Sequence, residues 1–365
     1  MTPGKSAVFL TILILFQGMF TDHAIARDDL VPGSRYTSAR AAAMGDAFLP
    51  LGDDVASGLF YNPANLSKIR SMELESSNFS LNVNSPFVSK IDFGSVNLPF
   101  LGSFLPTLTT ASPQFVGGGG AFLVDFGMPG FACGILMQTQ VGAQRNADGT
   151  ISYRSRYQII PAVGTGLKLF GGLLRMGYSL QWVNQAVGKI TAASSTSLAY
   201  TDGNAEGQAL SHNFGLSATL PITMLPTLNL VVRNAFGAHY AEPTYFSFAP
   251  ETSVVPAPEA MTFDGSFSIQ RHLGKGGQLN IVGEFKDILG QSPEVLGRIS
   301  VGAEIAIRRK VFFRGGWGRG YPAAGIGFKG EKAELSFTWY TAEIGTSYLS
   351  QGDMRFMMQY QVRSF

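Results

Sequence analysis

Side chains that could act as nucleophiles or general bases are scarce in this chain of 365 residues. Beyond residue 26 the histidines are His212, His239 and His272, and each falls near the end of an expected strand, where an interfacial position is more common than a catalytic one. The sequence shows no triad-like grouping of Ser or Asp with them and no metal-ligand spacing. Cys133 is the only cysteine, and Gly117–Gly120 is not followed by the Lys of a phosphate-binding loop. The sequence therefore predicts neither an enzyme nor a cofactor or metal site.

The charged residues of the second half follow a strand-like alternation. Between Gly297 and Arg308 the odd positions are aliphatic, as at Val301 and Ile305, and the even positions are small, polar or charged. Successive side chains of a strand point to opposite faces, so one face is apolar and the other carries the charges. Six charged residues take the polar face: Asp264, Glu284, Lys286, Arg298, Glu304 and Glu334. We expect them to pair with one another and with a plug inside a confined lumen; the alternative is that they select solutes along a polar path.

The same alternation recurs in other segments of similar length. Residues 211–220, 262–270, 278–286 and 333–341 set aliphatic or aromatic residues against Ser, Thr, Asn, Gln or a charge, with Val282 as an exception. These lengths approach the roughly 9 to 11 residues with which a tilted strand crosses a bilayer. A soluble β-sandwich would also alternate, but its polar face would carry many Lys and Glu. The uncharged polar face favours the interior of a barrel.

The first residues indicate export. Lys5 precedes an apolar run at Ala7–Phe16, and Ala24-Ile25-Ala26 has the small-x-small pattern of a signal-peptidase site. The apolar run is too short for a membrane anchor, because a helix needs about 20 residues to span the hydrocarbon core. We therefore predict a signal peptide over residues 1–26.

Composition narrows the class of the exported chain. Charged residues make up 14% of the sequence and hydrophobic residues 45%, and no later stretch is a convincing membrane helix. Soluble domains average about 25% charged residues, so this chain has too few charges to cover a surface in water. The net charge of +2 and the lack of a basic block argue against nucleic acid as a partner. An exported, apolar chain without apolar helices fits an all-β transmembrane barrel in a bacterial outer membrane.

The expected connections alternate in length, as they do in bacterial barrels. Short turns are predicted at Gly- and Pro-containing positions, namely 127–130, 171–172, 274–277 and 330. Longer, more polar links are predicted at 145–150, 192–210, 241–259 and 345–352. This pattern separates one end of the barrel with short turns from another with longer loops.

Counting the candidate strands predicts an antiparallel barrel of about fourteen strands over residues 71–365, with 84–113 the least regular stretch. Outer-membrane lipid, lipopolysaccharide and the barrel assembly machinery are then the expected partners. The terminal Phe365 agrees with recognition by that machinery, although it is out of phase with the apolar face that ends at Val362.

Residues 27–70, before the first strand, form a segment of a different kind. Ala41–Ala43 favour a helix. Asp53 can cap a second short helix that runs to Phe60, and Asn62-Pro63 would end it. These residues alone predict a pair of short helices packed on the rest of the protein.

The run from Arg40 to Leu66 resembles the N-terminal signature of the FadL-like superfamily of outer-membrane proteins, particularly its PorV/PorQ-type branch. The matching residues are Arg40, Met44, Gly45, Ala47, Asp53, Asp54, Ala56, Phe60, Asn62, Pro63 and Ala64. The common form of the signature has Gly where Asp46 stands and often where Asn65 stands. The resemblance covers a small part of the chain, in an order and spacing that are fairly specific.

The resemblance implies a fold and two alternative functions. In the fatty-acid transporters of the superfamily this segment is a hatch inside a fourteen-stranded barrel, and Asn62-Pro63-Ala64 would anchor it to the wall. The first expectation is thus a channel through which small hydrophobic compounds diffuse, with residues 27–70 as the plug. The alternative is a PorV-like barrel that does not transport and serves secretion or surface attachment of an exported protein. An outer-membrane enzyme ranks third.

Overall fold

The computed structural model describes residues 36–90, 115–193, 204–242, 254–274, 276–290, 294–345 and 347–364. The predicted signal peptide, the stretch 91–114 and Phe365 lie outside them. The strands are β1 (Glu73–Asn84), β2 (Phe115–Met128), β3 (Phe131–Arg145), β4 (Thr150–Leu169), β5 (Leu174–Ala193), β6 (Asn204–Thr219), β7 (Thr227–Ala235), β8 (Thr262–Gly274), β9 (Gly277–Phe285), β10 (Ile299–Ile307), β11 (Val311–Gly318), β12 (Tyr321–Lys329), β13 (Ala333–Glu343) and β14 (Gly352–Arg363). The helical elements are α2 (Ala39–Ala43), α3 (Val55–Phe60), η1 (Pro63–Lys68), α4 (Ser85–Lys90), η3 (Phe170–Gly172) and η4 (Leu296–Arg298).

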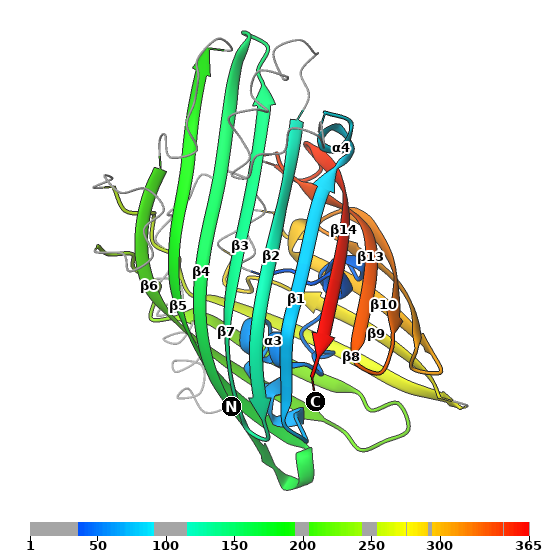
Figure 1. Ribbon diagram of the computed structural model, residues 1–365. Coiled ribbons are helices and arrows are strands. Elements are labelled where there is room, and N and C mark those ends of the chain that lie inside the picture. Colours follow the sequence, from blue (N-terminus) through cyan, green and yellow to red (C-terminus); the bar gives the residue numbers. More distant parts are fainter. Residues whose placement is uncertain are drawn as a thin grey trace, which may run out of the picture.

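The fourteen strands of these described ranges form one closed antiparallel barrel (Figure 1). Each strand pairs with its neighbours in sequence, and β14 closes the sheet by pairing with β1 from Asn84↔Arg355 to Glu75↔Arg363. Closure leaves no unpaired sheet edge, which is how a barrel satisfies its backbone without water. The predicted fold class, an antiparallel barrel of about fourteen strands, is confirmed.

The predicted alternation sets the two faces of the wall. On β10 the outward Val301 and Ile305 are 47% and 44% exposed, whereas the inward Glu304 is 1% exposed. Val282, the exception in the pattern of β9, points inward with its neighbours Asn280 and Glu284 and is fully buried. An apolar outer face around a polar, filled interior is typical of barrels that sit in lipid. Among the described residues, no helix has both the length and the apolar character that crossing a membrane requires.

Two of the predicted longer links lie at the expected places but are shorter than predicted. Residues 146–149 form a tight turn, in which Asn146 N–H donates to the Thr150 carbonyl over 2.8 Å. In the region 192–210, β5 extends to Ala193 and β6 begins at Asn204, so much of the predicted loop is strand. Ala, Gly and Gln are weak strand formers by themselves, and here pairing with the neighbouring strand decides. The barrel wall is therefore tall at β2–β6 and lower at β8–β14 (Figure 1).

The described part of the N-terminal segment, Tyr36–Arg70, packs against the inner wall, where Figure 1 shows it in blue among the strands. Helix α2 contacts β12 and β13, α3 contacts β2 and β3, and η1 contacts β4, β5 and β6. We call this part the inner segment. The segment thus bridges opposite sides of the barrel.

Local capping explains why the inner segment adopts these short helices. Ser38 caps α2 by accepting from the Ala41 amide over 3.1 Å. The cap of α3 is Asp54, which accepts from the Ser57 amide over 2.7 Å, and not Asp53 as predicted. Asp54 lies three residues before Ser57, so its carboxylate reaches a free amide of the first turn. Asp53 is left available for a different contact.

Candidate functional site

The contact between the inner segment and the wall is the candidate functional site, and the Asn62-Pro63-Ala64 motif is its most closely fitted part. We call these three residues the anchor motif. The Asn62 side chain is fully buried; its amide donates to the Leu49 carbonyl at 3.2 Å and to Ser217 Oγ and Asn229 Oδ1 at 3.3 Å. Its carbonyl oxygen accepts from the Ala64 amide over 3.1 Å and so caps η1. One side chain therefore joins two parts of the inner segment to strands β6 and β7.

Glycines in the wall allow the anchor motif to touch the backbone of the strands. A Cβ added at Gly177 on β5 would lie 2.0 Å from the Pro63 carbonyl oxygen, and one at Gly215 on β6 would lie 2.2 Å from Asn62 Oδ1. At Gly166 on β4 the added carbon would lie 2.5 Å from the Ser67 amide nitrogen. Any side chain at these inward positions would force the segment off the wall.

A second backbone contact lies at Met44-Gly45. Met44 is fully buried, and Cβ atoms added at Gly302 and Gly316 would approach its backbone to 2.6 and 2.1 Å. Gly45 has φ +64° and lies against Gly318, where an added Cβ would be 2.0 Å from its carbonyl oxygen. The inner segment is thus fitted to glycine-lined strips of β4–β6 and of β10–β11.

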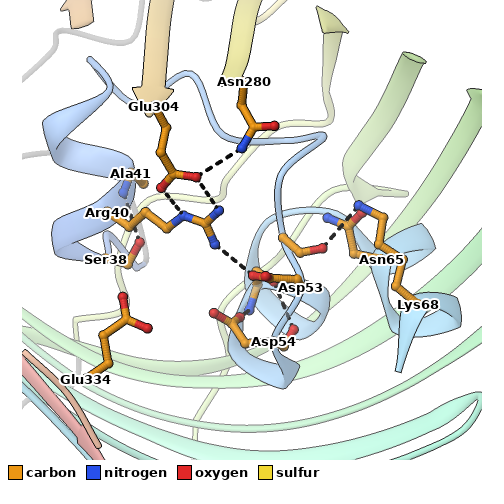
Figure 2. A network of polar contacts seen from close by, with 12 residues as sticks. Ser38, Arg40, Ala41, Asp53, Asp54, Asn65, Lys68, Asn280, Glu304 and Glu334 are labelled. Atoms are coloured by element: carbon orange, nitrogen blue, oxygen red, sulfur yellow. Dashed lines mark hydrogen bonds and ion pairs between the residues drawn. The ribbon is translucent and has the colours of Figure 1, made fainter. Parts of the chain in front are cut away.

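A third contact is ionic: Arg40 of the inner segment pairs with Glu304 on β10 (Figure 2). Arg40 Nε and Nη2 donate to the two carboxylate oxygens, each over 2.8 Å, and Nη1 donates to Asp53 Oδ1 over 2.7 Å. Burial lowers the pKa of Arg40, but the carboxylates of Glu304 and Asp53 outweigh it and raise that pKa well above its usual value. The pair is therefore a fixed ionic contact between segment and wall.

The wall supplies Glu304 with further donors. Arg314 Nε on β11 donates to Glu304 over 2.8 Å, and Asn280 on β9 donates over 3.0 Å. Arg314 also donates to Ser336 Oγ over 3.0 Å and to Glu334 over 3.3 Å. Because these donors belong to the barrel, Glu304 stays satisfied even when Arg40 is removed.

Two more charged side chains of the wall hold backbone groups of the segment. Glu284 on β9 accepts from the amides of Phe48 and Leu49 over 3.0 and 3.2 Å. Arg233 on β7 donates to the carbonyls of residues 60 and 61 over 3.0 and 3.1 Å, while its Nε pairs with Asp264 over 2.7 Å. Such bonds hold the chain whatever its side chains are, so they position the segment without requiring a sequence motif.

Five of the six predicted lumen charges therefore lie in this network. Lys286 pairs with Asp46 of the inner segment and lies 3.8 Å from Glu284. Arg298 differs: it lies in η4, just before β10, where it donates to the Asp287 carbonyl over 2.8 Å and stacks over Phe285. The sequence pattern assigns Arg298 to the strand, but β10 begins one residue later. In the turn before the strand, the direction of a side chain does not follow the alternation.

The other half of the inner wall carries an apolar row. Five buried, inward residues lie on adjacent strands β2 to β6, with Leu123 opposite Leu136, Leu136 opposite Ile160 and Val183 opposite Ala209. Segment residues that pack on this row and its surroundings form one buried cluster with it: Phe48, Leu49, Val55, Leu59, Phe60, Tyr61 and Leu66. One step higher on the wall, Gln138, Gln158 and Gln185 form a ladder of amide hydrogen bonds. The β2–β6 side of the interior thus carries one apolar row bordered by amide side chains, whereas the β9–β14 side carries charged residues such as Glu284, Glu304 and Arg314.

Two cavities adjoin the inner segment in the described part of the protein. One, of about 90 Å³, lies between α2 and the wall and has a mixed lining, with amides and hydroxyls such as Asn82, Gln138 and Tyr340 beside apolar residues such as Ala121, Ala323 and Met357. The other, of about 30 Å³, lies beside Arg40 and Asp53. Neither of these two cavities is a continuous apolar passage.

Lys68, also in the inner segment, links two parts of that segment to each other. Its ammonium donates to the carbonyls of Pro50 and Gly52 over 2.7 and 3.1 Å. Burial, with a smaller contribution from Arg175, lowers the pKa of Lys68 from 10.5 to about 7.

The described residues contain no group of three or more His, Cys, Asp or Glu that could hold a metal ion. His212 lies on the outer face of β6, where its Nδ1 contacts the Tyr178 hydroxyl at 2.8 Å.

Comparisons with known proteins give similarity in structure only. No protein-family model and no curated protein matches the chain. The TodX monoaromatic hydrocarbon channel deltaS2 mutant aligns with 90% of this chain and 99% of its own, at 10% identity and a TM-score of 0.49. The toluene transporter TbuX of Ralstonia pickettii aligns with 90% and 98%, at 11% identity and a TM-score of 0.37. Outer membrane phospholipase A of Escherichia coli aligns with 89% and 98%, at 9% identity and a TM-score of 0.30.

Proposed function

We propose that this protein is a channel of a bacterial outer membrane that passes small hydrophobic compounds, and that the inner segment is its gate. The observation that carries the proposal is the apolar row of β2–β6. The side chains that cover it belong to the inner segment and not to the wall itself, and polar bonds to wall residues such as Glu304 and Ser217 help to hold that segment. A segment that moved away would uncover a continuous apolar strip, on which a hydrophobic compound replaces the departed side chains at little cost.

The two halves of the interior then have separate tasks. The charged half, with Glu304 and Glu284, fixes the closed position of the segment through directional bonds. The apolar row offers nondirectional contacts to a molecule that cannot satisfy those bonds. Opening breaks the contacts to Glu304 and Glu284, and closing restores them once the compound has left.

Entry of the hydrophobic fluorescent dye N-phenyl-1-naphthylamine into cells that make the protein tests this function. In an Arg40→Gln background, which weakens the closed state, we expect rapid dye entry. Adding Ile160→Asn, which places an amide in the apolar row, should slow entry severalfold, whereas Ile160→Leu, which keeps the row apolar, should not. Equal entry for Asn and Leu at this position would show that the row is not the path.

A second candidate function is docking of an exported protein, and the height of β4 and β5 favours it. Each has 20 residues, about twice the length that crosses a bilayer. A wall this tall offers a sheet surface beyond the membrane on one side of the barrel. Shortening the hairpin of β3 and β4 around residues 146–149 should release surface-attached proteins without changing dye entry. Unchanged surface proteins would count against docking.

A further inference from the structure

Glu75 on β1 and Asp125 on β2 are two buried carboxyl groups that lie opposite each other in the wall. They are 3% and 2% exposed, and both oxygens of Asp125 and Oε1 of Glu75 lack a hydrogen-bond partner within the described protein. Side chains opposite each other in antiparallel strands have Cβ atoms about 4.5–5.5 Å apart. Two carboxylates this close and buried, with three of their four oxygens lacking a donor, cannot both carry a charge at reasonable cost.

The groups around the pair leave it short of positive charge. Arg363 on β14 lies opposite Glu75 and is 3.9 Å from Asp54, the cap of α3. Glu73 on β1 and Glu334 on β13 add negative charge nearby. One guanidinium thus faces several carboxyl groups. A metal ion is a poor remedy, because the described residues hold no cluster of three or more ligands, and Asp54 already accepts from Ser57 and faces Arg363.

We propose that Glu75 and Asp125 hold at least one proton between them at neutral pH and form a proton-operated latch on α3. While the proton is bound, the protonated carboxyl donates a hydrogen bond to its neighbour. The pair then carries at most one negative charge and repels Asp54 only weakly. When the proton leaves to solvent, two carboxylates face Asp54 across the start of α3. Since Val55 of α3 packs against Gly127, two residues from Asp125, the repulsion acts where the helix meets the wall. A rise in pH therefore loosens α3, and a fall in pH secures it.

The proton itself is tested by infrared spectroscopy of the purified full-length protein between pH 5 and 10. The wild type should show a protonated-carboxyl C=O band at neutral pH that disappears at higher pH. Asp125→Asn should remove or shift that band, whereas Glu331→Gln, an equal charge change in an exposed turn, should leave it unchanged. A spectrum without such a band at neutral pH, or a band indifferent to Asp125→Asn and Glu75→Gln, overturns the proposal.

The latch is tested by amide hydrogen exchange of residues 55–60, corrected for the intrinsic effect of pH. In the wild type we expect exchange of α3 to rise by about tenfold or more as the band disappears, because one added like-charge repulsion at close range is worth at least that factor. Asp125→Asn should abolish the rise and Glu331→Gln should keep it. Hydrogen exchange of α3 that does not change together with the infrared band refutes the latch. An effect of the latch on the passage of compounds would rest on the proposed function of the inner segment as a gate. The infrared and exchange measurements do not depend on that function, so the latch and the gate can be refuted independently.

Discussion

Replacing Arg40 by Gln isolates the ionic contact between the inner segment and the wall. Arg40 is 16% exposed and donates two 2.8 Å bonds to a carboxylate that is 1% exposed. A hydrogen bond to a charged group contributes about 1.5–3 kcal/mol. Glu304 keeps Arg314 and Asn280, so no buried charge is left alone and the barrel itself is not weakened.

The expected cost to the closed state is about 2–4 kcal/mol, because the glutamine returns at most one weaker bond. At ~1.4 kcal/mol per factor of ten, the ratio of open to closed segment rises about 30- to 700-fold. If the segment is the gate, the ratio of conducting to silent time of single molecules in planar bilayers rises by the same factor.

The matched control is Arg70→Gln, the same substitution at an exposed position at the end of the same segment. It should leave the conducting fraction within about threefold of the wild type, as a surface charge contributes little. Equal behaviour of the two variants would refute the reasoning, because the bonds of Arg40 would then not hold the closed state.

Three further predictions concern the inner segment and its contacts. Gly177→Ala should lower the melting temperature, at a cost of about 1–3 kcal/mol, because its Cβ would enter the anchor motif, whereas Gly283→Ala, which meets open space, should not. Glu304→Gln should lower the free energy of unfolding in detergent by about 3–5 kcal/mol, since it removes the buried carboxylate that Arg40 and Arg314 share. The same change at Glu334, which accepts one 3.3 Å bond from Arg314, should cost about 1 kcal/mol or less. The depressed pKa of Lys68 means that the unfolded chain binds more protons between pH 7 and 10.5, so the stability of the wild type relative to Lys68→Gln should rise across that window; a flat difference would contradict the assignment.

Strand faces could be predicted from the sequence because alternation is local. The pattern of β10 needs only the order of its residues to place Glu304 inside and Ile305 outside, and the barrel confirms it. The end of α3 at Phe60 followed in the same way from Pro63, which begins a new helical turn.

Other features depend on contacts between distant parts of the chain. Nothing near Gly177 or Gly215 shows that they receive the anchor motif; the available signal was glycine at inward positions of otherwise regular strands. Arg233 was missed because it binds backbone carbonyls, which leave no trace in sequence. The sequence predicts Asp53 as the cap of α3, because the role of Asp53 as partner of Arg40 appears only when the segment is folded.

The most direct test of the gate is the conductance of the purified protein in planar bilayers, with and without residues 27–70. The full-length protein should be nearly silent, because the inner segment crosses the lumen from its contacts on β4–β6 to those on β10–β11. Without the segment, the apolar row and the charged half should border a large and steady pore. If both forms are silent, or if both conduct alike, the inner segment does not gate a channel and the central claim fails.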